Sequence, residues 1–193
     1  AYSRSGLFTD YSRPFIEMTG KVLGVIGLGA IGSKVARIGS AFGMKVIYYS
    51  TSGTNHSEEY PSVSLEHLMR KSDVISVHAP YNERTAGLVG EKELRMMKPK
   101  AIIVNMGRGG IVVEEALAKV IDEGVIGGAG LDVYSTEPIP ENHPLLHTRH
   151  PERLSMTPHI AWASIEARER LMNIAISNLQ AYISGKPENV VIK

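Results

Sequence analysis

The chain has 193 residues, of which 43% are hydrophobic and 21% are charged, and its formal net charge is +1. These values are typical of a globular domain with one buried core, and they give no electrostatic reason to expect nucleic acid or an acidic membrane as a partner. There is no cysteine, which excludes disulfides, zinc–thiolate sites and thiol nucleophiles, and fits the reducing cytoplasm, where we expect the protein.

Segments with strand and helix patterns alternate along the chain. Val22–Ile26 is a continuous apolar run ending at a glycine, which is typical of a strand buried on both faces of a parallel sheet. Ala30–Phe42 has apolar residues at helical spacing, and Gly43 is a natural stop. The later predictions, in chain order, are a strand over Val46–Tyr49, a helix over Ser64–Lys71, a strand over Val74–His78, a helix over Glu91–Met97, a strand over Ala101–Asn105, a helix over Glu114–Glu123, a strand over Gly128–Val133, a further candidate strand over Leu154–Thr157 and a long amphipathic helix over Ile165–Ile183. Such repeats predict an α/β fold with a doubly wound parallel sheet, which binds ligands at the carboxyl ends of its strands.

The first predicted strand ends in the pattern G-x-G-x-x-G, which also opens the first helix. Gly27 allows a tight turn, Gly29 lets a pyrophosphate approach the backbone, and Gly32 lets the helix pack close to the strand. The free N–H groups of Ala30 and Ile31 would point at the phosphates, helped by the helix dipole. Because both flanks fit, we interpret the pattern as a dinucleotide-binding loop rather than a merely structural turn.

The second predicted strand lacks the acidic residue that usually hydrogen-bonds the adenosine ribose. Ser50 occupies the expected position and Thr51 follows it, and neither would repel a 2′-phosphate. The next acid is Glu58, and no Arg or Lys follows directly, so the nearest downstream candidates are His56 and more distant basic residues. A plain polar loop that tolerates either cofactor stays open. We therefore expect NAD or NADP as the cofactor, with NADP slightly favoured.

Three later strand ends carry candidate catalytic side chains. Arg108 lies among glycines and could hold a carboxylate through two parallel N–H bonds, although a surface Arg in a turn fits equally well. Glu137 follows the fifth predicted strand, and His159 follows the candidate sixth. Spacing alone does not show that they meet, but both strand ends reach the same edge of such a sheet. A His paired there with a Glu would donate and accept protons, with its ring oriented by the carboxylate.

Five motifs, in order, make the sequence resemble the D-isomer-specific 2-hydroxyacid dehydrogenase family. They are GLGAIG at Gly27–Gly32, HAPYNERT at His78–Thr85, NMGRGGIV at Asn105–Val112, GLDVYSTEP at Gly130–Pro138 and TPHIAWAS at Thr157–Ser164. The resemblance implies a Rossmann-type domain and a hydride transfer between a nicotinamide cofactor and C2 of a small-molecule 2-keto or 2-hydroxy acid. Trp162 and the following Ala-Ser resemble the glycerate dehydrogenase or hydroxypyruvate reductase branch.

The resemblance also implies roles for single residues. His159 would be the proton donor in reduction, Glu137 its orienting partner, and Arg108 the group that polarises the carbonyl and binds the carboxylate. Asp132 would contact the nicotinamide side of the cofactor. The other cofactor contacts that the resemblance implies are His78, Ala79 and Pro80 beside the adenosine, Met106 and Gly107 under the nicotinamide ribose, Thr85, Ala161, and Arg108 and His159 themselves.

Members of this family carry a first lobe before the glycine-loop strand, whereas here only residues 1–19 precede that region. We therefore expect residues 1–19 to be the remnant of an interdomain segment and residues 20–163 to be the dinucleotide-binding domain. Residues 164–193 would be a C-terminal helix and tail that pack on the missing lobe. Such a chain should bind cofactor but turn substrate over poorly, and we expect the parent enzyme to be a homodimer.

Two rival functions and a metal site also stay open. The fold could serve as a dinucleotide-sensing, corepressor-like binding module, or resemble a homocysteine hydrolase, against which the Arg, Glu-Pro and Pro-His motifs argue. His143, His147 and His150 could suggest a metal site. However, Pro144 and Pro151 break regular structure and no acid cluster supports it, so we expect solvated histidines in a loop and no metal.

Overall fold

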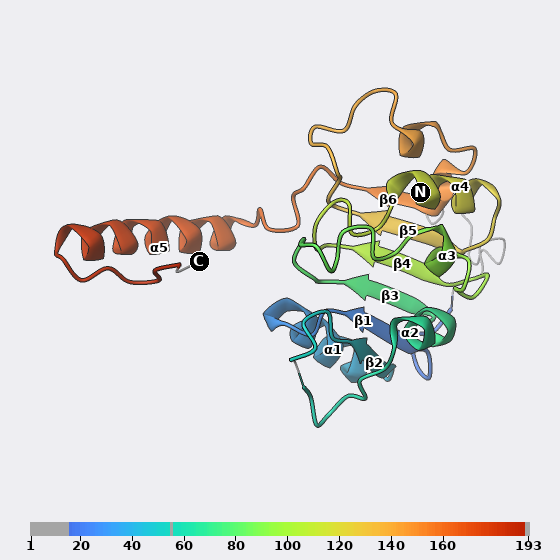
Figure 1. Ribbon diagram of the computed structural model, residues 1–193, viewed down its shortest axis with the longest axis horizontal. Helices are drawn as coiled ribbons and strands as arrows, with labels where there is room; N and C mark the ends of the chain where they lie inside the picture. Colours follow the sequence, from blue (N-terminus) through green and yellow to red (C-terminus); the bar gives the residue numbers. More distant parts are fainter. Residues whose placement is uncertain (1–15, 55, 192–193) are drawn as a thin grey trace, which may run out of the picture.

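The computed structural model describes residues 16–54 and 56–191, whose core is a six-stranded parallel sheet (Figure 1). The strands are β1 (Val22–Ile26), β2 (Lys45–Tyr49), β3 (Val74–Val77), β4 (Ile102–Asn105), β5 (Gly128–Leu131) and β6 (Leu154–Met156). Their order is β2-β1-β3-β4-β5-β6, and each neighbouring pair is parallel. The predicted parallel sheet is confirmed, including its sixth strand.

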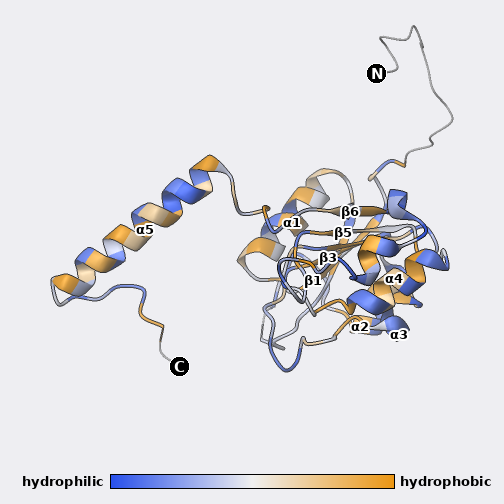
Figure 2. Ribbon diagram, turned by 90° about the horizontal axis from the view of Figure 1, so that it is seen from above, coloured by the Kyte–Doolittle hydropathy of each residue, from blue (hydrophilic) through white to orange (hydrophobic). Residues whose placement is uncertain are grey.

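Of the five helices in the described residues, four cover the two faces of this sheet and the last stands away from it (Figure 2). They are α1 (Ala30–Ala41), α2 (Leu65–Lys71), α3 (Glu91–Leu94), α4 (Glu114–Asp122) and α5 (Ile165–Ile183), with 3-10 turns η2 (Pro144–His147) and η3 (Pro151–Arg153). Neighbouring residues of a strand point to opposite faces. Leu23 lies against Gly39 of α1, and Gly24 lies against Leu68 of α2. The two helices therefore pack on opposite faces of β1, as a doubly wound fold requires.

Each face has its own buried core. The core beneath α1 is small and includes Leu23, Val25, Ala36, Val46 and Tyr48. The core beneath α2, α3 and α4 is larger and includes Ile26, Leu68, Ile75, Ile103, Leu117 and Ile121. Each fully buried aliphatic side chain contributes about 1.5–3 kcal/mol, so these cores account for much of the stability that holds the strand ends in place.

Most of the apolar residues at helical spacing in α1 lie outside its buried face. Of the apolar residues at helical spacing, Ile31, Ile38 and Phe42 are exposed, and Val35 is partly buried against the core. The buried face consists of small residues instead: Gly32, Ala36 and Gly39. A Cβ atom at Gly39 would lie 2.5 Å from a methyl carbon of Leu23. The helix thus lies unusually close to β1, which fixes its N-terminus at the end of that strand.

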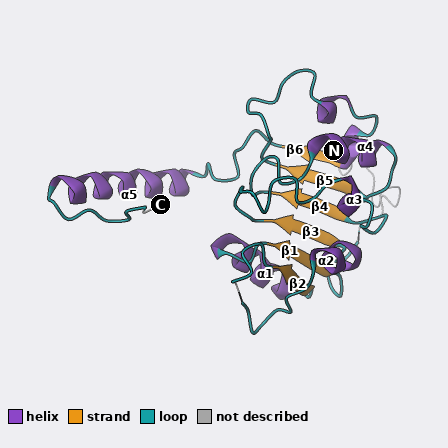
Figure 3. Ribbon diagram, in the orientation of Figure 1, coloured by secondary structure: helices purple, strands orange, loops and turns teal. Residues whose placement is uncertain are grey.

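Helix α5 stands apart from the sheet and its helices (Figures 1 and 3). All of it lies within the described residues, and none of its residues is buried. Among the described residues, no helix is long and apolar enough to cross a membrane. Residues 1–15 of the expected interdomain remnant lie outside the described residues, and the division at residues 19/20 and 163/164 stays a prediction.

Candidate active site

The glycine loop between β1 and α1 leaves open space beside the backbone. Gly27 has a φ of +90°, a conformation that favours glycine, and its N–H donates to the carbonyl oxygen of Tyr49 at 3.0 Å. A Cβ atom at Gly32 would collide with the carbonyl oxygen of Gly27, whereas a Cβ atom at Gly29 would meet nothing within 4 Å. The loop therefore packs tightly on its inner side and is open at Gly29. The approach of a pyrophosphate to Gly29 remains a prediction.

The N-terminus of α1 adds a favourable field to this open space. The helix begins at Ala30, with Gly29 as its N-cap. The first N–H groups of a helix have no partner within the helix, and the helix dipole places partial positive charge there. The first turn of α1, which lies wholly within the described residues, carries no acidic side chain. The predicted donors, the N–H groups of Ala30 and Ile31, therefore belong to a helix end suited to an anion.

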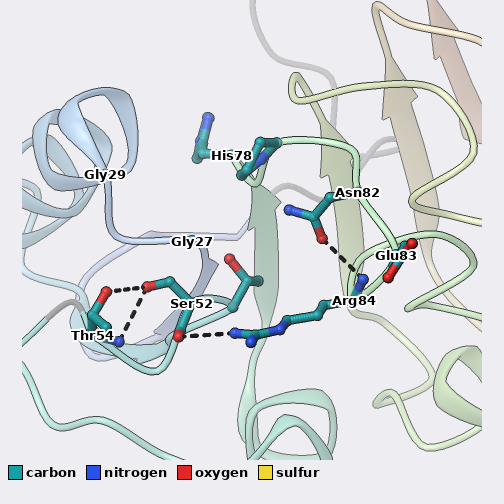
Figure 4. A pocket seen from close by; sticks show the side chains of 10 residues that line it. Gly27, Gly29, Ser52, Thr54, His78, Asn82, Glu83 and Arg84 are labelled. Atoms are coloured by element: carbon teal, nitrogen blue, oxygen red, sulfur yellow. Dashed lines mark hydrogen bonds between the residues drawn. The ribbon is translucent and has the colours of Figure 1, made fainter. Parts of the chain in front are cut away.

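A cavity of about 490 Å³ lies beside this loop at the ends of three strands. Its lining residues are Gly27 and Gly29 after β1, Thr51, Ser52 and Thr54 after β2, and His78, Pro80, Asn82, Glu83 and Arg84 after β3 (Figure 4). Ser50 is not among the described residues that line it, and its hydroxyl accepts a bond from the Gly53 N–H at 3.1 Å. The hydroxyl groups that line the cavity therefore begin at Thr51.

Sequence reasoning missed Arg84, which lies in this cavity. Its Nη1 donates to the carbonyl oxygen of Ser52 at 3.3 Å, from the loop after β3 to the loop after β2. Because β1 lies between β2 and β3 in the sheet, these two loops meet across the end of β1. Thr85, predicted as a cofactor contact, is fully buried, and its hydroxyl donates to the carbonyl oxygen of Pro80 at 2.6 Å. Thr85 therefore holds the loop in shape, while the adjacent Arg84 faces the cavity.

His78 joins this cavity to the next one along the sheet edge. Its Nε2 lies 2.8 Å from the Ser76 hydroxyl, and burial lowers the pKa of the ring. Among the described residues, its Nδ1 is a buried side-chain nitrogen without a hydrogen-bond partner. The second cavity is lined by Ile31, His78, Ala79, Pro80, Tyr81, Met106, Gly107 and Arg108. All of these residues except Tyr81, seven in number, are predicted cofactor contacts, and the structure gathers them there.

The predicted His–Glu pair is formed in the structure. Nδ1 of His159 lies 2.7 Å from one carboxylate oxygen of Glu137, and the other oxygen accepts the Tyr134 N–H at 3.0 Å. The bond from His159 and the bond from the Tyr134 backbone lower the pKa of Glu137 below its ordinary value. Glu137 is therefore ionised at neutral pH and accepts from Nδ1–H of His159, which leaves Nε2 available for proton transfer.

Asp132 fixes the turn that carries His159. It is 2% exposed, and one carboxylate oxygen accepts from the Thr157 hydroxyl at 2.6 Å and the Ile160 N–H at 2.9 Å. The other oxygen accepts the Ala161 N–H at 2.9 Å. These bonds hold His159 at a φ of +55°, which is rare for a side-chain-bearing residue. Asp132 and Ala161, both predicted as cofactor contacts, are therefore bonded to each other, and their contact with a nicotinamide remains a prediction.

Arg108 lies in the same cavity as the His–Glu pair. The buried Asn105 shapes its turn by donating to the Arg108 carbonyl oxygen at 3.0 Å and accepting the Gly107 N–H at 3.1 Å. A cavity of about 420 Å³ is lined by Tyr81, Arg108, Gly109, Gly110, Tyr134, Ser135, Glu137 and His159. The three predicted catalytic residues, which are far apart in the sequence, thus line one cavity at the carboxyl edge of the sheet.

The expectation that His143 is solvated is wrong. His143 is only 6% exposed, and its Nε2 lies 2.8 Å from the carboxylate of Glu114, which is 3% exposed. Glu114 also accepts the N–H of Ser135 at 2.6 Å and its hydroxyl at 2.8 Å. Helix α4 carries Glu114 beneath the loop that contains Glu137, so His143 is a buried partner of that carboxylate. Within the described residues, no group of three or more His, Asp or Glu side chains could hold a metal ion.

A glycine loop that opens a helix and a cleft along the strand ends are features of a dinucleotide-binding domain, and here a His–Glu pair lies at the same edge of the sheet. The family described as "D-isomer specific 2-hydroxyacid dehydrogenase, NAD binding domain" matches residues 2–161. This chain therefore belongs to that family, and its domain binds a nicotinamide dinucleotide.

Similar proteins carry names of the same kind. The chain is 46% identical over 180 residues to a glyoxylate reductase of Aeropyrum pernix, covering 91% of this chain and 53% of that protein. It is 42% identical over 188 residues to a hydroxypyruvate reductase of Blautia hydrogenotrophica, covering 96% and 57%. A solved structure of the acyclic imino acid reductase Bsp5 with NADPH and D-Arg matches with a TM-score of 0.86 at 38% identity, covering 98% and 60%. The chain thus spans little more than half the length of the curated relatives it matches.

Proposed function

We propose that this chain is the cofactor-binding part of an oxidoreductase that transfers a hydride between a nicotinamide cofactor and a D-2-hydroxy acid or its 2-keto acid. The observation that carries this proposal is the single cavity lined by Arg108, Glu137 and His159. It lies at the carboxyl edge of the sheet, where folds of this class bind their ligands. The names of the relatives support the same reaction class.

The residues of the cleft fit a dinucleotide. The open space at Gly29 and the N-terminus of α1 suit a pyrophosphate. The unpartnered, buried Nδ1 of His78 offers a polar contact midway along the cleft. When bound, the nicotinamide would supply the hydride in reduction and accept it in oxidation. The chain's own residues would orient the substrate and move the proton.

His159 would handle the proton through Nε2. In reduction Nε2–H would donate to the carbonyl oxygen of the keto acid, and in oxidation Nε2 would take the proton from the hydroxyl. Glu137 would keep Nδ1 protonated and stabilise the positively charged ring, since its carboxylate lies 2.7 Å from Nδ1. Asp132 would hold the backbone of this turn, and so the position of the ring.

Arg108 would bind the substrate carboxylate and polarise the carbonyl. A guanidinium can form two parallel hydrogen bonds with a carboxylate, and its charge favours the negative charge that develops on the carbonyl oxygen. Its place in the same cavity as His159 supports this role. A lysine at this position would supply charge without the two-pronged geometry.

The favoured substrate is a small 2-keto acid such as hydroxypyruvate, with glycerate as its reduced form. Trp162 and the names of the glyoxylate and hydroxypyruvate reductases support this choice. The corepressor-like alternative finds no support in these names. A homodimeric parent enzyme and a cytoplasmic location stay predictions of the same proposal.

For the cofactor, we favour NADP slightly over NAD. Thr51 and Ser52 line the cavity where an acid would repel a 2′-phosphate. The family description names NAD, whereas the Bsp5 structure contains NADPH. Both cofactors therefore belong in the first assays.

The test is NAD(P)H oxidation by the full-length protein with hydroxypyruvate, glyoxylate and pyruvate. His159→Ala should lower kcat by about 10²–10⁴-fold, the range for loss of a general acid, while cofactor binding is retained. His147→Ala is the matched control, because His147 is exposed at the end of η2, outside the cavity with His159, and its loss should leave kcat unchanged. Wild-type kcat in His159→Ala would refute the proposed role.

A further inference from the structure

We propose that Arg84 binds the 2′-phosphate of NADPH, so that the loop after β3, rather than the loop after β2, supplies the cation that sets cofactor preference. This inference rests on the proposed use of the cleft for a nicotinamide dinucleotide. The loop after β2 contains no Arg or Lys that could serve, since residues 50–59 have none. The proposed cation, Arg84, lies on the loop after β3 and reaches the loop after β2 across the end of β1.

The structure places Arg84 beside the expected ribose position. Gly27 N–H donates to the Tyr49 carbonyl oxygen at 3.0 Å, so the residues after Tyr49 start next to the phosphate-binding loop. In folds of this class the adenosine ribose lies at this strand end. Nη1 of Arg84 lies 3.3 Å from the Ser52 carbonyl oxygen. The guanidinium therefore lies where a 2′-phosphate would project from the ribose.

The charges around this point favour an anion. Arg84 and Glu83 both line the cavity, but Figure 4 shows the Arg84 side chain reaching toward Ser52 while Glu83 lies at the other end of Arg84, away from Ser52. Residues 50–57 contain no Asp or Glu. His78 is neutral at pH 7, because burial lowers the pKa of its ring. A 2′-phosphate beside Ser52 would thus meet a cation and no nearby carboxylate from this loop.

Hydroxyl groups complete the anion site. Thr51, Ser52 and Thr54 line the same cavity, and the hydroxyls of Ser52 and Thr54 lie 2.9 Å apart. One of these two hydroxyls donates to the other, so the pair has one proton left that it can donate to a phosphate oxygen. The bond of Arg84 to a neutral carbonyl is long and exposed, and a phosphate would offer shorter, charge-assisted bonds. Arg84 is thus already extended toward the site.

A different role for Arg84 would leave a different signature. The guanidinium could stack on the adenine or bond the bare ribose, as it could with any adenine dinucleotide. Loss of Arg84 would then weaken NADH and NADPH binding equally. Binding of the 2′-phosphate instead predicts a loss confined to ligands that carry this group.

The experiment is a titration of this chain with NADPH and NADH by nicotinamide fluorescence, and with 2′,5′-ADP and 5′-AMP as competitors. Arg84→Ala should weaken NADPH and 2′,5′-ADP by about 10- to 100-fold, as expected for loss of a charge-assisted bond, and change NADH and 5′-AMP by less than about threefold. Arg70→Ala is the control, because Arg70 is an exposed arginine on α2 outside the cavity.

Three results would overturn the role of Arg84 and leave the proposed function standing. These are equal losses for all four ligands, no loss for any, or a wild-type chain that binds NADH well and NADPH poorly. A wild-type chain that binds neither dinucleotide would overturn the proposed function and, with it, this inference. Because Arg84 is exposed, Arg84→Ala should keep the wild-type melting temperature, and this is measured alongside.

Discussion

Replacing Asp132 by Asn tests how the turn around His159 is held. The buried carboxylate accepts bonds from the Thr157 hydroxyl and from the N–H groups of Ile160 and Ala161. An amide of the same shape presents its NH₂ group to one of these donors, which loses its acceptor. A buried, unpaired donor costs about 1–3 kcal/mol, and a bond to a charged group contributes about 1.5–3 kcal/mol. We expect the free energy of unfolding at pH 7 to fall by about 2–4 kcal/mol.

The pKa of Asp132 gives this variant a second signature. Burial acts to raise this pKa, but the hydrogen bonds from Thr157, Ala161 and Ile160 outweigh it, so the folded pKa lies below the ordinary value of 3.8. A carboxyl group with a depressed folded pKa stabilises the fold above its unfolded pKa, and this stabilisation is lost as the pH falls through the folded pKa. The difference between wild type and Asp132→Asn should therefore be complete at pH 7 and shrink below about pH 4.

The assay is urea unfolding followed by circular dichroism at pH 7, 5, 4 and 3. Glu58→Gln is the control, because Glu58 is an exposed carboxylate and its loss should change stability by less than about 0.5 kcal/mol. A wild-type urea midpoint for Asp132→Asn at pH 7 would refute the view that this carboxylate holds the turn. A loss of stability that is the same at pH 3 as at pH 7 would contradict the stabilising role of the ionised carboxylate.

The remaining predictions concern the glycine loop and the buried pair of His143 and Glu114. Gly32→Ala should destabilise the fold by about 1–3 kcal/mol, because its Cβ would collide with the Gly27 carbonyl oxygen. Gly29→Ala should lower the free energy of unfolding by less than about 1 kcal/mol. It should weaken NADH and NADPH binding by roughly tenfold, as loss of one phosphate contact would. Cofactor titrations and unfolding curves of both variants separate the effect on binding from the effect on stability. His143→Ala should destabilise the fold by about 3 kcal/mol, because it leaves Glu114 buried without one partner. The control His147→Ala should destabilise it by less than about 0.5 kcal/mol. An equally small loss for His143→Ala would contradict the pairing of His143 with Glu114.

Local patterns were sufficient to predict the elements of the fold. The bounds of β1 and α5 agree with the prediction, and the remaining elements differ at their ends by one to three residues. Continuous apolar runs and capping residues are local signals; for example, the Ser64 hydroxyl accepts the His67 N–H at the start of α2. The parallel sheet follows from the alternation of these elements.

The face of α1 and the site of His143 could not be read from the same patterns. Apolar spacing indicates a stripe but not which neighbour covers it, and small residues allow α1 to approach β1 more closely than large ones would. His143 looked like a loop residue because its partner, Glu114, lies 29 positions earlier in the chain. Such pairings depend on the path of the loop over α4, which has no periodic signal.

Parts of the site were within reach of sequence reasoning. The expectation that Glu137 and His159 reach the same sheet edge follows from topology, and the two side chains lie in contact. Their orientation depends on the bond that the Tyr134 N–H donates to Glu137 and on the bonds that Asp132 accepts from the turn after His159. Arg84 could have been found from the motif HAPYNERT together with the strand order, since β2 and β3 flank β1. What the motif alone does not give is the direction of the side chain.

The proposed hydride transfer is tested most directly by following the hydride itself. The full-length protein is given hydroxypyruvate and a reduced nicotinamide cofactor carrying deuterium at C4, on each face in separate reactions, and the product is examined by mass spectrometry and chiral chromatography. We expect D-glycerate with one deuterium at C2, from one face of the cofactor only. Glycerate of the L configuration, or a D product without deuterium at C2 from either face, would contradict it.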